Sequence, residues 1–167
     1  MNTALSLVSV QPDDVPSSAL TPGAQRIIRQ ALSILEQYLR QPGVSFLSAE
    51  ETRDWLRLKM AALEREEFMV LFLDNQHQLL ACETLFIGTI NHTEVHPREI
   101  VKAVLRHNAA AVILAHNHPS GTPEPSKADR LITTNVQNTL LLVGVQTLDH
   151  FIVGHREIVS FAERGWL

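Results

Sequence analysis

The sequence predicts an α/β domain, on three observations. Apolar runs of strand length alternate along the chain with stretches in which apolar residues recur at helical spacing. The run 68–73 is apolar at every position, which is typical of a central strand that is buried on both faces of a sheet. With 167 residues, the chain is long enough for one well-buried domain and short for two.

The chain is predicted to divide into a leader and one compact domain. Residues 1–20 are rich in proline, aspartate and serine and are expected to form a flexible arm. Residues 21–44 are expected to form a helix and a linker, because Pro22 suits the first helical position and Pro42-Gly43 would end the helix. The domain itself is expected to cover residues 45–167.

Local signals order the elements within this domain. Ser48-x-x-Glu51 is a helix capping box, Asp74-Asn75 marks a turn, and Gly144 would end a helix. In chain order, the predicted elements are a helix from Ser48 to about Leu63, a strand over 68–73, a strand ending near Ile87, a helix from Pro97 to about His107, a strand over 110–115, a helix over 127–142, and a hairpin of 145–153 and 157–161. No glycine-rich phosphate loop interrupts them, so nucleotide binding has no support.

Two histidines directly follow the third predicted strand. Side chains alternate between the two faces of a strand, so His116 and His118 are expected to point the same way. A loop rich in proline then leads to Asp129. This loop could bring the Asp129 carboxylate close to the two imidazoles. Two imidazoles and a carboxylate make three protein ligands with a fourth position open, which is the arrangement of a catalytic zinc rather than a structural one.

A purely structural interpretation competes for part of this motif. Ser126-x-x-Asp129 also has the spacing of a capping box, with Ser126 as the N-cap and Asp129 at the third helical position, where an acid suits the helix dipole. This alternative accounts for both residues without a metal, but it leaves the paired histidines unexplained. The two interpretations are compatible, since one hydroxyl can cap a helix and face a pocket.

The complete motif resembles that of the JAMM metalloproteases, which are also called JAB or MPN domains. In that pattern His116-x-His118 is followed by seven residues, Ser126, two residues and Asp129. Three further segments resemble the bacterial RadC branch: 118–121 (His-Pro-Ser-Gly), 95–99 (Val-His-Pro-Arg-Glu) and 148–150 (Leu-Asp-His). The resemblance covers the chain from about residue 45 to its end. It implies the JAMM (MPN, cytidine-deaminase-like) fold, a mixed, curved β-sheet flanked by helices.

The resemblance also implies a site. Zn²⁺ would be held by His116, His118 and Asp129, and Ser126 would donate a hydrogen bond to the oxyanion of a tetrahedral intermediate. RadC-like proteins usually carry a helix-hairpin-helix module ahead of this domain. A single helix is predicted there in this sequence, so the chain resembles the short form without that module. His150 is expected to contact a metal ligand, with packing as the alternative.

A zinc hydrolase needs a general base, which in JAMM enzymes is a glutamate at the start of the strand after the first domain helix. Glu67 is preferred here because it precedes Phe68, where the strand enters the core, and a partly desolvated carboxylate suits proton transfer. Glu66 is the rival, one residue away and on the opposite face. The alternative to both is that the two glutamates form a solvated helix end.

These residues predict a zinc-dependent metallohydrolase, a metallopeptidase or isopeptidase in which metal-activated water attacks an amide carbonyl. The expected partner is a peptide or protein substrate. One alternative is a noncatalytic JAMM interaction module or a DNA-repair accessory protein, and another is a metal-dependent nuclease. The presence of all five chemical residues favours the enzyme, since a scaffold has no need of a base.

Composition narrows the setting. The net charge of −4 and the lack of a basic run argue against nucleic acid as the main ligand. The lone Cys82 excludes an intramolecular disulfide, a cysteine-rich zinc site and the paired cysteines of zinc deaminases. No apolar run approaches the length of a membrane span and no secretory signal is recognisable, so a cytoplasmic location without membrane contact is expected.

Overall fold

The computed structural model of the chain describes residues 20–39, 49–88 and 94–167. Nearly all of the predicted arm, the segment after residue 39 and the capping residue Ser48 lie outside these ranges. The elements are α1 (Pro22–Leu39), α2 (Ala49–Met60), β1 (Glu67–Leu73), β2 (Leu79–Ile87), α3 (Pro97–Arg106), β3 (Ala111–Asn117), α4 (Lys127–Leu141), β4 (Gln146–Val153) and β5 (Ile158–Ser160). The predicted α/β class is confirmed.

The strands form one mixed sheet in the order β2-β1-β3-β4-β5. Neighbours pair antiparallel except β3 and β4, which are parallel. That pair is joined through α4, as parallel strands require a crossover connection. β1 and β3 lie inside the sheet, which explains why the run 68–73 is apolar at every position.

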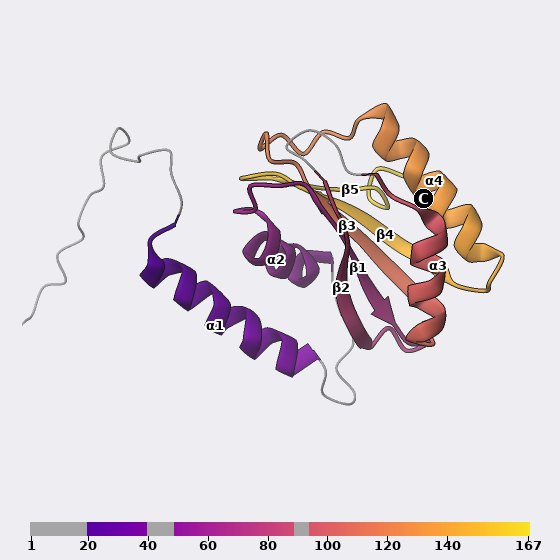
Figure 1. Ribbon diagram of the computed structural model, residues 1–167, viewed down its shortest axis with the longest axis horizontal. Coiled ribbons are helices and arrows are strands. Elements are labelled where there is room, and N and C mark those ends of the chain that lie inside the picture. Colours follow the sequence, from indigo (N-terminus) through magenta and orange to yellow (C-terminus); the bar gives the residue numbers. More distant parts are fainter. Residues whose placement is uncertain (1–19, 40–48, 89–93) are drawn as a thin grey trace, which may run out of the picture.

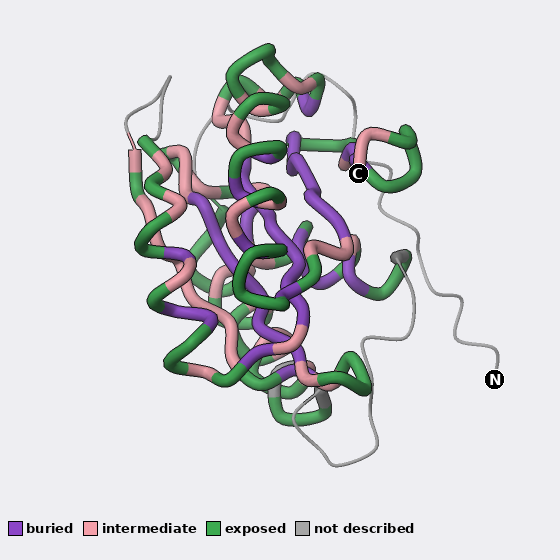
Figure 2. Tube along the Cα trace, turned by 90° about the vertical axis from the view of Figure 1, so that its right-hand side faces the viewer, coloured by how far each residue is buried: buried purple, intermediate pink, exposed green. Residues whose placement is uncertain are grey.

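Helices cover both faces of the sheet, with α1 and α2 on one side and α3 and α4 on the other (Figure 1). Alternation along β3 sends Ile113 and Ala115 to the α2 side and Val112 and Leu114 to the α3–α4 side. Each face buries a separate apolar cluster, and the strands run through the buried centre of the molecule (Figure 2). Within the described residues, none of the helices is long and apolar enough to cross a membrane.

The third strand is longer than the sequence indicated. It was predicted to end at residue 115, but it continues through His116 and Asn117. Both neighbouring strands pair with this extension, since Phe68 of β1 pairs with His116 and Val153 of β4 pairs with Asn117. These cross-strand hydrogen bonds override the polar character of the two residues. The first ligand candidate therefore lies within the sheet, which restricts its movement.

Candidate metal centre

Three side chains that could bind a metal meet at the C-terminal end of β3. The Nε2 atoms of His116 and His118 lie 3.1 Å apart, and Asp129 places Oδ1 3.3 Å from Nε2 of His116 and Oδ2 3.5 Å from Nε2 of His118. Ligands at about 2.0–2.1 Å from a tetrahedral zinc are separated by about 3.3–3.4 Å, so these distances fit one face of such a site. The residues present therefore suit the metal that the motif implies.

The capping box and the ligand geometry coexist at the start of α4. Ser126 donates its backbone N–H to Oδ2 of Asp129 at 2.7 Å, and its Oγ accepts the backbone N–H of Asp129 at 3.1 Å. The structural interpretation of these two residues is thus correct, and it does not exclude a role at the metal. Because the carboxylate is fixed by the helix N-terminus, its Oδ1 faces His116.

Hydrogen bonds to the opposite ring nitrogens orient both imidazoles. Nδ1 of His118 lies 2.9 Å from the carbonyl oxygen of Thr122, which can only accept, so this nitrogen carries the proton and Nε2 keeps its lone pair. Nδ1 of His116 lies 2.8 Å from Nε2 of His150. His150 also packs against Phe161, with ring centroids 4.8 Å apart, so it contacts a ligand and contributes to packing.

Electrostatics prepare the carboxylate to bind a cation. Burial alone would raise the pKa of Asp129, but the adjacent imidazoles of His116 and His118 hold it well below its usual range. Burial lowers the pKa of His118, and the Asp129 carboxylate and the Thr122 carbonyl more than reverse that effect. Burial, reinforced by the nearby imidazole of His116, lowers the pKa of His150 well below its ordinary value. Asp129 is therefore ionised and His150 is neutral.

Glu67 points away from this group. It precedes Phe68, whose ring stacks on His116 at a centroid distance of 5.9 Å, and successive residues of a strand face opposite sides. The Glu67 carboxylate accepts a hydrogen bond of 3.2 Å from the hydroxyl of Thr84. Thr84 pairs with Met69, which belongs to the cluster on the α2 side of the sheet. The structure therefore does not bring Glu67 together with the metal ligands.

Glu66 lies just before β1, which begins at Glu67, and it acts electrostatically on the metal-binding group. Burial lowers the pKa of His118, and the Asp129 carboxylate raises it. The negative charge of Glu66 raises the pKa of His118 further. The backbone carbonyl of Glu66 accepts the N–H of Gly88 at 2.8 Å, which fixes the chain just before β1. The charge of Glu66 therefore reaches the site.

The residue between the two histidines ties the glutamate segment to the ligand strand. Asn117 is 2% exposed, and its Oδ1 accepts the backbone N–H of Glu67 at 2.8 Å. Its Nδ2 donates to the carbonyl oxygens of Arg65 at 3.0 Å and Leu63 at 3.4 Å. The sequence analysis did not identify this role of Asn117. The alternation of side chains along a strand did imply that Asn117 faces the opposite side from His116 and His118.

The loop between His118 and Ser126 is anchored by close backbone packing. Gly121 donates its N–H to the carbonyl of His118 at 2.8 Å and adopts φ +85°, a conformation that favours glycine. A Cβ on Gly154 would lie 2.4 Å from the carbonyl oxygen of Gly121. The backbone N–H of His155 donates to that same oxygen at 3.1 Å. The turn after β4 thus fixes the position of the loop.

A second anchor comes from the C-terminal turn. The two terminal guanidinium nitrogens of Arg164 donate to the carboxylate of Glu124, at 2.7 and 2.9 Å. Arg130 of α4 lies over the ring of Trp166, 4.0 Å from its centroid. These contacts join the loop and the first turn of α4 to the end of the chain.

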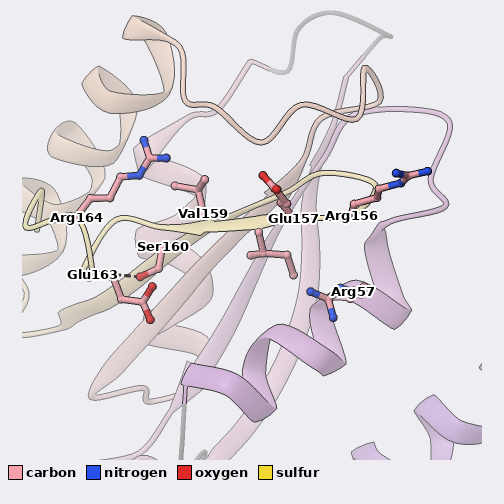
Figure 3. A pocket seen from close by; sticks show the side chains of 8 residues that line it. Arg57, Arg156, Glu157, Val159, Ser160, Glu163 and Arg164 are labelled. Atoms are coloured by element: carbon pink, nitrogen blue, oxygen red, sulfur yellow. Dashed lines mark hydrogen bonds between the residues drawn. The ribbon is translucent and has the colours of Figure 1, made fainter.

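A hollow of about 420 Å³ lies along β5, at the edge of the sheet (Figure 3). Its lining includes three arginines, Arg57, Arg156 and Arg164, and two glutamates, Glu157 and Glu163. None of its lining residues is a metal ligand candidate. The hollow is therefore distinct from the His–His–Asp group.

Comparison with known families agrees with the motif. The model of a family described as the RadC-like JAB domain matches residues 46–166. The chain belongs to the RadC-like JAB domain family. The resemblance inferred from the histidine, serine and aspartate spacing is confirmed, and the mixed sheet with its flanking helices is consistent with the JAB/MPN fold.

Several relatives of this RadC-like JAB domain are known by sequence. The UPF0758 protein YkfG of Escherichia coli (strain K12) is 60% identical over 148 residues, which cover 89% of this chain and 94% of that protein. The UPF0758 protein YeeS of the same organism is 59% identical over 148 residues, covering 89% of this chain and all (100%) of that protein. A UPF0758 protein of Dechloromonas aromatica (strain RCB) is 51% identical over 162 residues, covering 96% of this chain and 70% of that protein.

Proposed function

We propose that this chain is a zinc-dependent metallohydrolase that cleaves an amide bond in a peptide or protein, as a metallopeptidase or isopeptidase. One observation carries the proposal: the ligand atoms of His116, His118 and Asp129 converge at 3.1–3.5 Å. Two imidazole nitrogens and one carboxylate suit zinc, and three protein ligands leave the fourth position open to water or substrate. When bound, the metal would act as a Lewis acid and supply a nucleophilic water near neutral pH.

Glu66 is assigned here as the general base in place of Glu67. Its charge reaches His118, whereas the Glu67 carboxylate is bonded to Thr84 on the other side of the sheet. A carboxylate beside the open ligand position would accept a proton from the attacking water and later return it to the leaving amine. The rest of the proposed mechanism is unaffected by this exchange of neighbours.

Ser126 is assigned as the donor to the developing oxyanion. Its Oγ accepts the backbone N–H of Asp129, so the hydroxyl proton is not consumed by the capping interaction. The side chain is exposed and is held beside the carboxylate ligand by the first turn of α4. A donor fixed in this way is typically worth about 3 kcal/mol in the barrier to acyl transfer.

The proposal includes a cytoplasmic location and gives nucleic acid no role as the main ligand. The sequence has 14 basic and 18 acidic residues, and such a balance provides few charges for counterion release from DNA. Binding to duplex or single-stranded DNA is expected to be weak and to vanish near physiological salt. Submicromolar binding with a steep salt dependence would favour the DNA-repair alternative instead.

Metal content of the purified protein tests the site directly. Protein prepared without chelators is expected to contain about one zinc per chain, and His116→Ala is expected to lose it. His77→Asn is the matched control, because His77 lies in an exposed turn with φ 60°, which asparagine tolerates. An unmodified chain without metal, or a His116→Ala chain with normal metal, would contradict the proposal.

A further inference from the structure

We propose that the hydroxyl of Thr133, acting through His150, selects the tautomer of His116 that is able to bind a metal. Thr133 belongs to none of the spacing patterns of the metal motif, and it is 2% exposed. Its Oγ lies 2.6 Å from the carbonyl oxygen of Asp129 and 2.6 Å from Nδ1 of His150. The inference rests on the proposed metal-dependent function and adds a positioning residue to its site.

The directions of these hydrogen bonds follow from one fixed group. The carbonyl oxygen of Asp129 can only accept, so at 2.6 Å the single hydroxyl proton of Thr133 must be donated to it. The remaining contact of the hydroxyl oxygen, with Nδ1 of His150, must then be one that it accepts. Nδ1 of His150 therefore carries a proton.

The second step passes from His150 to His116. His150 is completely buried against Phe68 and Phe161, where a charged imidazolium would be costly, so its ring carries one proton. With that proton on Nδ1, its Nε2 has a lone pair and accepts from Nδ1 of His116 at 2.8 Å. Nε2 of His116 is then the unprotonated nitrogen, and this is the atom that faces His118 and Asp129.

The hydrogen bonds that run from Asp129 through Thr133 and His150 to His116 form a relay, which connects two of the three candidate ligands. Thr133 lies four residues after Asp129, so both are on one face of α4, and the backbone of one ligand fixes the imidazole of the other. Without the hydroxyl, His150 is free to carry its proton on Nε2 and donate it to Nδ1 of His116. That would put the proton of His116 on Nε2, where it blocks metal binding.

Zinc affinity measured by competition with a chromophoric chelator tests the relay. Thr133→Val, which removes the hydroxyl and keeps the shape, is expected to weaken zinc binding about 10–100-fold, in the range found for lost partners of metal-bound histidines. Thr133→Ser, which keeps a hydroxyl, is expected to bind zinc with the affinity of the unmodified chain. Thr134→Val is the matched control, because its hydroxyl also donates to a carbonyl four residues earlier, that of Arg130 at 3.0 Å, on an exposed face.

The tautomers can also be measured in the unmodified chain, which avoids any folding defect of a variant. Nitrogen-15 spectra of labelled histidines are expected to show His150 protonated on Nδ1 only. Protonation of His150 on Nε2, or unchanged zinc affinity in Thr133→Val, would overturn the relay while leaving the proposed hydrolase intact. An unmodified chain that binds no zinc would instead contradict the proposed function itself.

Discussion

The side-chain oxygen of Asn117 accepts the backbone N–H of Glu67 at 2.8 Å, which joins the end of β3 to the start of β1. His116 and His118 flank this asparagine, and Glu66 precedes the residue that it holds. The ligand pair and the proposed base are therefore placed relative to one another by this buried amide together with the pairing of Phe68 with His116 across β1 and β3. These connections explain how two segments that are about 50 residues apart in sequence lie side by side.

Exchange of each glutamate for glutamine separates the two candidate bases. Glu66→Gln keeps the shape of the side chain and removes the proton acceptor, so amide hydrolysis is expected to fall by about 10²–10⁴-fold with zinc retained. Glu67→Gln is expected to have little effect, because that carboxylate is bonded to Thr84. The measurement is the metal-dependent rate on a peptide or isopeptide substrate, together with metal content. The reverse order of effects would restore Glu67 as the base.

Truncation of Asn117 is expected to loosen the proposed base. Asn117→Ala leaves the N–H of Glu67 and the carbonyl of Arg65 without this partner, and because both groups are only partly buried the expected loss lies below the cost of about 1–3 kcal/mol for a fully buried unmet group. Urea unfolding should show a loss of stability, and hydrogen exchange at the amide of Glu67 should accelerate. Asn138→Ala, on an exposed position of α4, is the matched control. Unchanged exchange at Glu67 would show that Asn117 does not hold this segment.

A methyl group at Gly154 is expected to displace the ligand loop. Its Cβ would lie 2.4 Å from the carbonyl oxygen of Gly121, a backbone atom that cannot move without shifting the loop after His118. Gly154→Ala should therefore weaken zinc binding, as measured by chelator competition. Gly23→Ala is the control, since a Cβ there has no atom within 4 Å. Equal zinc affinity in both variants would mean that the loop adapts freely.

The stability of the fold is expected to depend on pH through Asp149. Burial raises the pKa of Asp149 more than its hydrogen bonds from Ser160, Ala162 and His150 lower it. Ionisation then costs the folded chain more than the unfolded one, so the free energy of unfolding should fall as pH rises from about 3.9 through the raised pKa. Asp149→Asn removes this titration, and its stability relative to the parent should increase over that window.

Urea unfolding at a series of pH values provides the measurement for Asp149. The difference in unfolding free energy between Asp149→Asn and the parent is the informative quantity, because other titrating groups cancel in it. A difference that stays constant across the window would show that Asp149 titrates alike in the folded and unfolded chains.

Much of this molecule was accessible from local sequence patterns. Hydrophobic periodicity and capping signals located the elements, and the structure places β1, β3 and α4 within a few residues of the predictions. The convergence of His116 and His118 was predictable because it depends only on the period of a strand. Asp129 followed from a helix start, since the capping box fixes its carboxylate at the N-terminus of α4.

The proposed choice of Glu66 over Glu67 as the base rests on the tertiary structure alone. A strand puts neighbours on opposite faces, but which face meets the metal depends on the pairing of Phe68 with His116 across two strands. The part played by Thr133 likewise depends on how α4 packs against β4, because only that packing brings its hydroxyl to His150. Chain periodicity sets which residues share a face, whereas long-range packing sets which faces meet.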